Sequence, residues 1–246
     1  MNRNRMKISI NLLTMVVLFA TIGTSAAEPQ KQTEAEGTIH VSAFDLPLSV
    51  FLSAEARADM RKNPQSTFPT TNVSQLKACN EAAVGEIAEI RKCYDRFIVL
   101  PLLAQHETRY QVDIEPQTIA GIYTESITPQ DGPSKQNRNR VLINLHGGGF
   151  TVGGRAGGRL ESVPIAALGK IRVVSVDYRM YPEHVFPAAS EDVAAVYNVL
   201  LKTYKPENIG IYGCSAGGML TAQSVAWFQK EGLPKPGAIG VFCAGI

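Results

Sequence analysis

The segment Ile209-Gly-Ile-Tyr-Gly-Cys-Ser-Ala-Gly-Gly218 decides the fold prediction for this chain. Its apolar beginning is typical of a buried strand, and residues 216–230 have the apolar spacing of a helix. The Gly-x-Ser-x-Gly pattern indicates a sharp strand-to-helix turn, because side chains flanking the serine would collide there. Such a turn would present the Ser215 hydroxyl at a helix N-terminus, where the helix dipole favours developing negative charge. The plainer alternative is a serine that only caps the helix.

Three glycines follow a similar apolar run earlier in the chain. Residues 141–145 read as a strand, and His146-Gly-Gly-Gly-Phe150 comes directly after them. Glycines leave backbone amides unshielded, so the amides of Gly148, Gly149 and Ala216 could donate hydrogen bonds to the oxyanion of a tetrahedral intermediate. A flexible turn and a phosphate-binding loop are the alternatives. Neither Gly-x-Gly-x-x-Gly nor Gly-x-x-x-x-Gly-Lys occurs in the sequence, which disfavours nucleotide binding.

Strand-like and helix-like segments alternate through the second half of the chain. This alternation predicts a mostly parallel sheet with helices on both faces, whose ligands bind at the carboxyl ends of the strands. Residues 110–115 and 119–126 read as two further strands with a turn near Pro116, followed by a polar loop at residues 129–140. The predicted parallel strands are residues 141–145, 171–176, 209–212 and 238–242, and the predicted helices are residues 160–169, 189–203 and 216–230.

Two helices are predicted before this region. Residues 45–62 read as a helix that Asp45 caps, and residues 75–99 read as a second helix that follows Ser74. The segment between them, residues 63–73, is rich in proline and small polar residues and reads as a loop. Together the two helices could cover one end of a larger domain.

Cys79 and Cys93 both lie in the second of these predicted helices. On one straight helix, a separation of fourteen residues places two positions about 21 Å apart. A disulfide needs Cα atoms within about 7 Å of each other. Either the helix breaks near Gly85 and the cysteines pair, or both are buried thiols, and the helical spacing favours buried thiols.

The first 27 residues have the layout of a cleaved export signal. Three basic residues lie near the start, an apolar stretch follows over residues 8–19, and residues 24–27 are small. An uncleaved N-terminal anchor is the alternative. We therefore expect a secreted or periplasmic protein that keeps no stable membrane span after cleavage.

The composition is that of an ordinary globular protein. The chain is 45% hydrophobic and 19% charged, which excludes a disordered or fibrous protein. The formal net charge is +2, so no strong attraction to nucleic acid is expected.

Three blocks of the sequence together point to a family. They are His146-Gly-Gly-Gly-Phe150, Asp177-Tyr-Arg-Met-Tyr-Pro-Glu-His-Val-Phe-Pro-Ala188 and Gly213-Cys-Ser-Ala-Gly-Gly218. In these blocks the chain resembles the hormone-sensitive-lipase-like esterases of the α/β-hydrolase fold. The resemblance implies ester hydrolysis with Ser215 as nucleophile and with Gly148, Gly149 and Ala216 as oxyanion donors. It also implies short acyl esters as substrates, and neither a cofactor nor a metal.

The N-terminal pattern and the resemblance together suggest a division of the chain into domains. Residues 1–27 would be the signal peptide, residues 28–109 an N-terminal helical cap, and residues 110–246 a partial α/β-hydrolase domain. Within that domain the resemblance implies a bracing role for the charged side chains of the middle block, and we expect His146 to position its loop rather than act as a base. The charged residues concerned are Asp177, Arg179, Glu183 and His184.

The chain departs from the family pattern at two places. Cys214 stands where the family has aspartate, and a thiol is a weaker hydrogen-bond partner than a carboxylate. In the family, the catalytic acid and the histidine follow the nucleophile. After Ser215 this sequence has no His and no Asp, and its one acid, Glu231, lies about 22 Å along the predicted helix. The four histidines all precede the serine: His40, His106, His146 and His184.

These departures leave three interpretations open. The first is an esterase that is incomplete after about its sixth strand, either as a fragment or as a truncated gene product. The second is a catalytically inactive binding module that keeps a hydrolase-like pocket. The third is an esterase that uses an upstream histidine as base, which the chain order of the family makes the weakest of the three.

Overall fold

The computed structural model describes residues 32–33, 39–40, 50, 52–62 and 70–245. The chain divides into two compact units, one that ends at Asn63 and one that begins at Pro64. The predicted export signal lies outside the described residues. No described helix is long and apolar enough to cross a membrane.

Among its described residues, the first unit contains a pair of short antiparallel strands and one helix. This helix begins after Ser53, later than the predicted start at Asp45, which lies outside the described residues. The Ser53 hydroxyl accepts a hydrogen bond from the Ala56 amide at 3.1 Å, so serine takes the capping role that was assigned to aspartate. The elements are β1 (Gln32–Thr33), its antiparallel partner β2 (Ile39–His40) and α1 (Ala54–Lys62).

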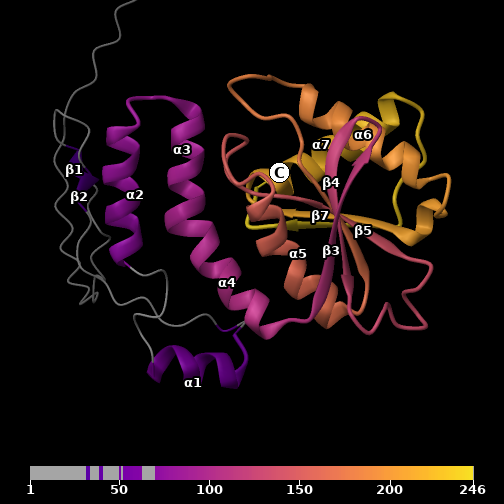
Figure 1. Ribbon diagram of the computed structural model, residues 1–246, viewed down its shortest axis with the longest axis horizontal. Coiled ribbons are helices and arrows are strands. Elements are labelled where there is room, and N and C mark those ends of the chain that lie inside the picture. Colours follow the sequence, from indigo (N-terminus) through magenta and orange to yellow (C-terminus); the bar gives the residue numbers. More distant parts are fainter. Residues whose placement is uncertain (1–31, 34–38, 41–49, 51, 63–69, 246) are drawn as a thin grey trace, which may run out of the picture. The chain divides into compact units, whose positions relative to one another are not determined.

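A six-stranded sheet lies at the centre of the second unit (Figure 1). The strand order is β3-β4-β6-β5-β7-β8, in which β6, β5, β7 and β8 are parallel and the β3–β4 hairpin is antiparallel. The predicted mostly parallel sheet is confirmed. The strands are β3 (Val112–Ile119), β4 (Ile122–Pro129), β5 (Val141–Leu145), β6 (Arg172–Val176), β7 (Ile209–Cys214) and β8 (Ala238–Phe242).

The hairpin between β3 and β4 turns later than predicted. Ala120 and Gly121 form the turn with φ angles of 52° and 83°, as a two-residue hairpin turn of the mirror-image type requires. Pro116, where the turn was expected, lies inside β3 opposite Glu125. The prediction was wrong because β3 is an edge strand, and an edge strand tolerates a residue without an amide hydrogen.

Helices cover both faces of the sheet, as predicted. Val141, Ile143 and Leu145 belong to one hydrophobic cluster together with side chains of α6 and α7. Leu142, between them, packs against a second cluster that includes side chains of α4 and α5. The helices are α4 (Leu100–Arg109), α5 (Ala156–Gly169), α6 (Ala188–Leu200) and α7 (Ala216–Lys230), and a short 3-10 helix, η2 (Pro206–Asn208), precedes β7.

The predicted helix at residues 75–99 is a pair of helices that reverses direction. Val84 and Gly85, with φ angles of 47° and 82°, end the first helix, and the chain turns back into the second. Figure 1 shows the two helices, α2 and α3, side by side. The elements are α2 (Thr70–Ala82), α3 (Ile87–Tyr94) and a π-helical segment, η1 (Asp95–Val99), which continues into α4.

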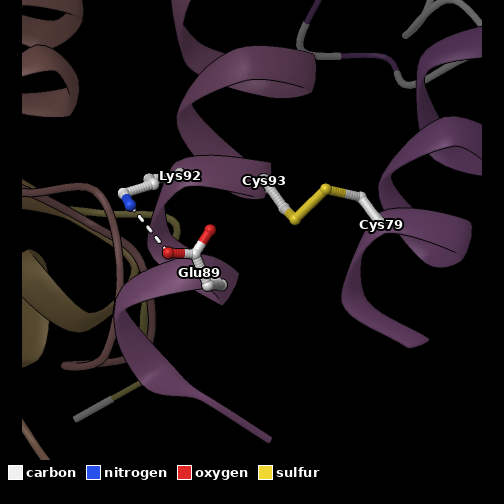
Figure 2. The surroundings of a disulfide bond; sticks show 4 residues. All are labelled: Cys79, Glu89, Lys92 and Cys93. Carbon is white, nitrogen blue, oxygen red and sulfur yellow. Dashed lines mark hydrogen bonds and ion pairs between the residues drawn. A yellow bond between two sulfur atoms is a disulfide. The ribbon is translucent and has the colours of Figure 1, made fainter. Parts of the chain in front are cut away.

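This reversal brings Cys79 and Cys93 together in a disulfide bond, with their Cα atoms 5.8 Å apart (Figure 2). The favoured interpretation of two buried thiols was therefore wrong, and the alternative, a break near Gly85, is correct. Helical spacing was misleading here because the apolar positions before and after the break keep a helical period when they are read as one sequence.

Candidate active site

Ser215 lies at the sharp turn between β7 and α7. Its backbone has φ 54° and ψ −122°, a conformation that residues other than glycine rarely adopt. The residue is exposed, and its amide donates a hydrogen bond to the Phe242 carbonyl at 2.8 Å. Its hydroxyl makes no hydrogen bond to any residue that the structure describes. The turn thus presents a free hydroxyl to solvent, as the sequence predicted.

The glycines on both sides of the serine are required by close backbone packing. A Cβ atom on Gly217 would come within 3.0 Å of the carbonyl oxygens of Leu145 and His146. A Cβ atom on Gly213 would collide with the Leu145 oxygen and with the Gly217 backbone. The end of β5 therefore fits directly against the turn, and only glycine leaves room for it.

The triple-glycine turn lies beside the serine. A Cβ atom built on Gly147 would be 3.6 Å from the Ser215 Cβ. Gly148 and Gly149 have φ angles of 114° and 61°, and their amides donate no hydrogen bond within the described residues. Ala216 is the first residue of α7, so its amide has no carbonyl partner within the helix. The structure thus places the three predicted donors, Gly148, Gly149 and Ala216, on segments adjacent to the serine.

The carboxylate of Glu161, on α5, connects the two turns. It accepts hydrogen bonds from the Gly147 amide at 2.8 Å and from the Asn144 side-chain amide at 2.9 Å. The Cys214 amide also donates to it. Burial raises the pKa of Glu161 above its ordinary value, although these hydrogen bonds favour the charged form.

Glu161 was not predicted as a site residue. One acid within a predicted helix reads as a solvent-facing side chain, and no motif singles it out. An acid among otherwise apolar and small residues of that helix was the only available signal, and it is a weak one.

His146 is enclosed beneath the glycine turn. It is fully buried, its ring is stacked on Tyr178 with centroids 4.2 Å apart, and its Nδ1 lies 2.8 Å from the Gly147 carbonyl oxygen. The Tyr178 hydroxyl donates to the His146 carbonyl at 2.6 Å. Burial lowers the pKa of His146 and favours its neutral form. These contacts agree with the predicted role of positioning the loop.

Arg91 of α3 joins the helical hairpin to two loops near the site. Its guanidinium donates to both carboxylate oxygens of Glu183 at 2.7 Å and to the Tyr181 carbonyl at 3.1 Å. Its Nε donates to the Thr151 carbonyl at 2.8 Å, and the Thr151 amide in turn donates to the Gly148 carbonyl at 3.0 Å. One cation therefore holds the exit of the glycine turn against the 181–183 segment.

Two further ion pairs fix the middle block of the resemblance. Asp177 pairs with Arg155 at 3.0 Å, and Arg179 pairs with Asp192 at 2.8 Å. Together with the Arg91–Glu183 pair, these contacts involve three of the four charged residues of the block, in keeping with the predicted bracing role. His184 is exposed and lies instead at the edge of a cavity.

This cavity, of about 320 Å³, opens beside the glycine turn. It is lined mainly by apolar side chains of the segment that follows Arg179, and Ser215 is not among its lining residues. Phe150, the last residue of the glycine turn, is one of its lining residues. Residues that line it include Phe150, Tyr181, His184, Val185, Phe186 and Gln223.

The described part of the chain contains no group of three His, Cys, Asp or Glu side chains placed to hold a metal ion. The arrangement at the turns is that of an exposed hydroxyl beside unpaired amides. Chemically, such a site can attack a carbonyl carbon and stabilise the resulting oxyanion.

Comparison with known proteins agrees with this geometry. Residues 142–246 match the family described as the alpha/beta hydrolase fold. The chain is 34% identical to an acetyl-hydrolase of Streptomyces hygroscopicus over 107 residues, which are 43% of this chain and 36% of that protein. It is 32% identical to an esterase of Acinetobacter venetianus over 130 residues, which are 52% of this chain and 41% of that protein. The chain therefore spans less than half the length of these curated relatives.

Solved structures give the same result for the fold. The crystal structure of esterase E25 superposes with a TM-score of 0.60 at 27% identity, covering 81% of this chain and 59% of that one. An esterase from the bacterial hormone-sensitive lipase family superposes with a TM-score of 0.53 at 26% identity, covering 70% of this chain and 57% of that one. The α/β-hydrolase prediction is confirmed, and so is the resemblance to hormone-sensitive-lipase-like esterases.

Proposed function

We propose that this chain, which has the α/β-hydrolase fold and resembles the hormone-sensitive-lipase-like esterases, is a serine carboxylic-ester hydrolase. Ser215 is its nucleophile, and the amides of Gly148, Gly149 and Ala216 form its oxyanion hole. The observation that carries this proposal is the free, exposed Ser215 hydroxyl next to a glycine turn in which the amides of Gly148 and Gly149 have no partner in the described chain.

The proposed reaction begins when the Ser215 oxygen attacks the carbonyl carbon of the ester. The carbonyl oxygen becomes an oxyanion, and fixed backbone amides stabilise its charge without having to reorganise during the step. The alcohol then leaves, an acyl-serine remains, and water releases the acid. Glu161 contributes by holding the amides of Gly147 and Cys214 in place, and it does not touch the reacting atoms.

A serine hydroxyl needs a base to remove its proton. His146 does not fit this role, since it is fully buried and stacked on Tyr178. We propose the chain order of the resembling family, in which the acid and the histidine follow the nucleophile. Both groups would then come from a segment beyond Ile246, and Ser215 alone would be a weak nucleophile.

Short acyl esters are the proposed substrates. The relatives named above include an acetyl-hydrolase and an esterase, and the cavity beside Phe150 has room for one small apolar group of an ester. We further propose that the protein is exported by its first 27 residues, because of their basic, apolar and small-residue order.

A fluorophosphonate probe tests the role of Ser215. The chain is treated with the probe alone and after addition of the C-terminal segment of the Acinetobacter venetianus esterase, and the labelled residue is mapped by mass spectrometry. We expect labelling of Ser215, stronger with the added segment, and none in Ser215→Ala. Cys214→Ser is the matched control and should keep the label, because its neighbouring serine is unchanged. Labelling that follows Cys214 instead, or none under any condition, would contradict the proposal.

One observation favours a second candidate, an inactive binding module. Within the described residues no side chain hydrogen-bonds to the Ser215 hydroxyl, so the site there has donors for an oxyanion but no base. Such a site could bind short esters or carboxylates without turnover. Calorimetry with acetate and ethyl acetate, with and without the added segment, separates the two functions. Binding that persists without hydrolysis in both cases would favour the second candidate.

A further inference from the structure

Two free thiols lie behind the nucleophile turn, and the proposed hydrolase reaction uses neither. Among the described cysteines, Cys79 and Cys93 are paired, whereas Cys214 and Cys243 are free. Cys214 is the last residue of β7, and Cys243 directly follows β8. Because β7 and β8 are neighbouring parallel strands, the two thiols lie together at the carboxyl ends of these strands.

The strand register sets the separation of their backbones. The Cα partner of Cys214 on β8 is Phe242, so Cys243 is one residue beyond it. Neighbouring strands are about 4.8 Å apart and rise about 3.3 Å per residue, which places the two Cα atoms about 6 Å from each other. Disulfide-bonded cysteines usually have Cα atoms about 4.4–6.8 Å apart. Their backbones therefore need no large movement to form a bond.

The backbone at Cys243 departs from the strand. In a regular strand, Cys243 would point to the opposite side of the sheet from Phe242 and Cys214. Its φ angle of 55° takes it out of the extended conformation, so its side chain does not follow this alternation. The Cys243 thiol lies near enough to Cys214 to raise the pKa of the Cys214 thiol.

The two thiols differ in access to solvent. Cys243 is exposed and Cys214 is only partly so. Burial raises the pKa of the Cys214 thiol to about 12, and the neighbouring Cys243 thiol adds to this. Since the thiolate is the reactive form, an external reagent should meet Cys243 first.

We propose that Cys214 and Cys243 are a redox-modification site, at which a small disulfide such as oxidised glutathione converts the thiol pair into a disulfide. The Cys243 sulfur attacks one sulfur of oxidised glutathione and displaces the first glutathione as a thiol. The Cys214 sulfur then attacks the Cys243 sulfur and displaces the second. Two cysteine thiols lose two hydrogens, and one oxidised glutathione becomes two glutathione thiols. The new bond ties the end of β8 to the residue that precedes Ser215.

Mass spectrometry of the whole chain tests this site. The purified protein, with its Cys79–Cys93 bond intact, is incubated with oxidised glutathione, and trypsin digestion under non-reducing conditions follows. We expect a loss of two hydrogens, loss of both free thiols, and a link between the tryptic peptides of residues 203–230 and 231–246, which carry Cys214 and Cys243. Reduced glutathione in excess should restore both thiols.

The matched variants are Cys214→Ser and Cys243→Ser. Cys214→Ser should keep one glutathione on Cys243, because no second thiol remains to displace it. Cys243→Ser should react far more slowly, because its remaining thiol is partly buried. The proposal is wrong if the wild-type chain carries two separate glutathiones, links Cys243 to Cys79 or Cys93, forms a dimer through Cys243, or keeps both thiols free. The wild-type result decides the question even if a variant does not fold.

Discussion

Replacing Gly217 with alanine is expected to lower the free energy of unfolding by about 3 kcal/mol or more. The new methyl group would lie within 3.0 Å of the backbone of Leu145 and His146. Backbone atoms at the end of a buried strand cannot rotate away as a flexible side chain can. Relief requires the start of α7 or the end of β5 to move by about 1 Å, a displacement at the costly end of overpacked substitutions.

Gly157 provides a matched control. It is the second residue of α5, as Gly217 is the second residue of α7, and a Cβ atom there meets no neighbouring atom within 4 Å. Alanine in this helix should therefore stabilise the protein by about 0.5–1 kcal/mol, because glycine loses more conformational freedom on folding.

Thermal unfolding, followed by circular dichroism, measures both changes. For a chain of this size 1 kcal/mol corresponds to about 2–4 °C in Tm. Gly217→Ala should therefore unfold about 6–12 °C below the wild type, and Gly157→Ala about 1–4 °C above it. If Gly217→Ala unfolded at the wild-type temperature, the close packing between the turn and β5 would be refuted, and with it the reason for the glycine. A general intolerance of alanine would show itself as a fall in both variants.

Three further predictions concern charged groups. Hydrogen bonds from Arg91 lower the pKa of Glu183 to about 2, so the stability that this contact gives is present above pH 4.5 and is lost as the pH falls through about 2. The difference in Tm between the wild type and Glu183→Gln should therefore be smaller at about pH 3 than at about pH 6. A difference that stays constant would contradict this. Burial raises the pKa of Glu161 above 4.5, so the folded state binds this proton more tightly than the unfolded chain does. The free energy of unfolding should therefore fall as the pH rises from 4.5 through the raised pKa. Urea unfolding at several pH values should show that this fall disappears in Glu161→Gln and not in Glu183→Gln. Burial raises the pKa of Glu125, but hydrogen bonds from Arg159 and Tyr123 and the charges of Arg159 and Arg155 together outweigh burial and lower it. Arg159→Met leaves this buried carboxylate without its main cation and should cost about 2–3 kcal/mol in urea unfolding, most of which Glu125→Gln in the same chain should recover.

The parallel part of the sheet was predictable because its inner strands β5, β6 and β7 are almost entirely buried and read as short apolar runs. The edge strand β8 is partly exposed but is also an apolar run, and β5, β8 and α7 have the predicted bounds. Glycine patterns marked the ends of β5 and β7, where close backbone packing excludes any other residue. The same glycine patterns pointed to Ser215 and the amides beside it as a candidate site.

Elements that depend on distant contacts were predicted less well. Pro116 is a turn signal in isolation, and only the position of β3 at the sheet edge makes it acceptable in a strand. The reversal between α2 and α3 needs Val84 in a left-handed conformation, which no local pattern indicates. The pairing of Cys79 with Cys93 followed from that reversal. Glu161 escaped notice because its partners, Asn144, Gly147 and Cys214, come from other elements.

The backbone of residue 215 is held from three directions. Its amide is bonded to the Phe242 carbonyl, the preceding amide is bonded to Glu161, and the carbonyls at the end of β5 press against Gly217. The left-handed conformation is thus imposed by the surroundings and does not depend on the serine hydroxyl, which bonds to none of them. A cysteine or an alanine at this position would be oriented as the serine is. A substitution at position 215 can therefore change or remove the reactive group without moving the place where that group is presented.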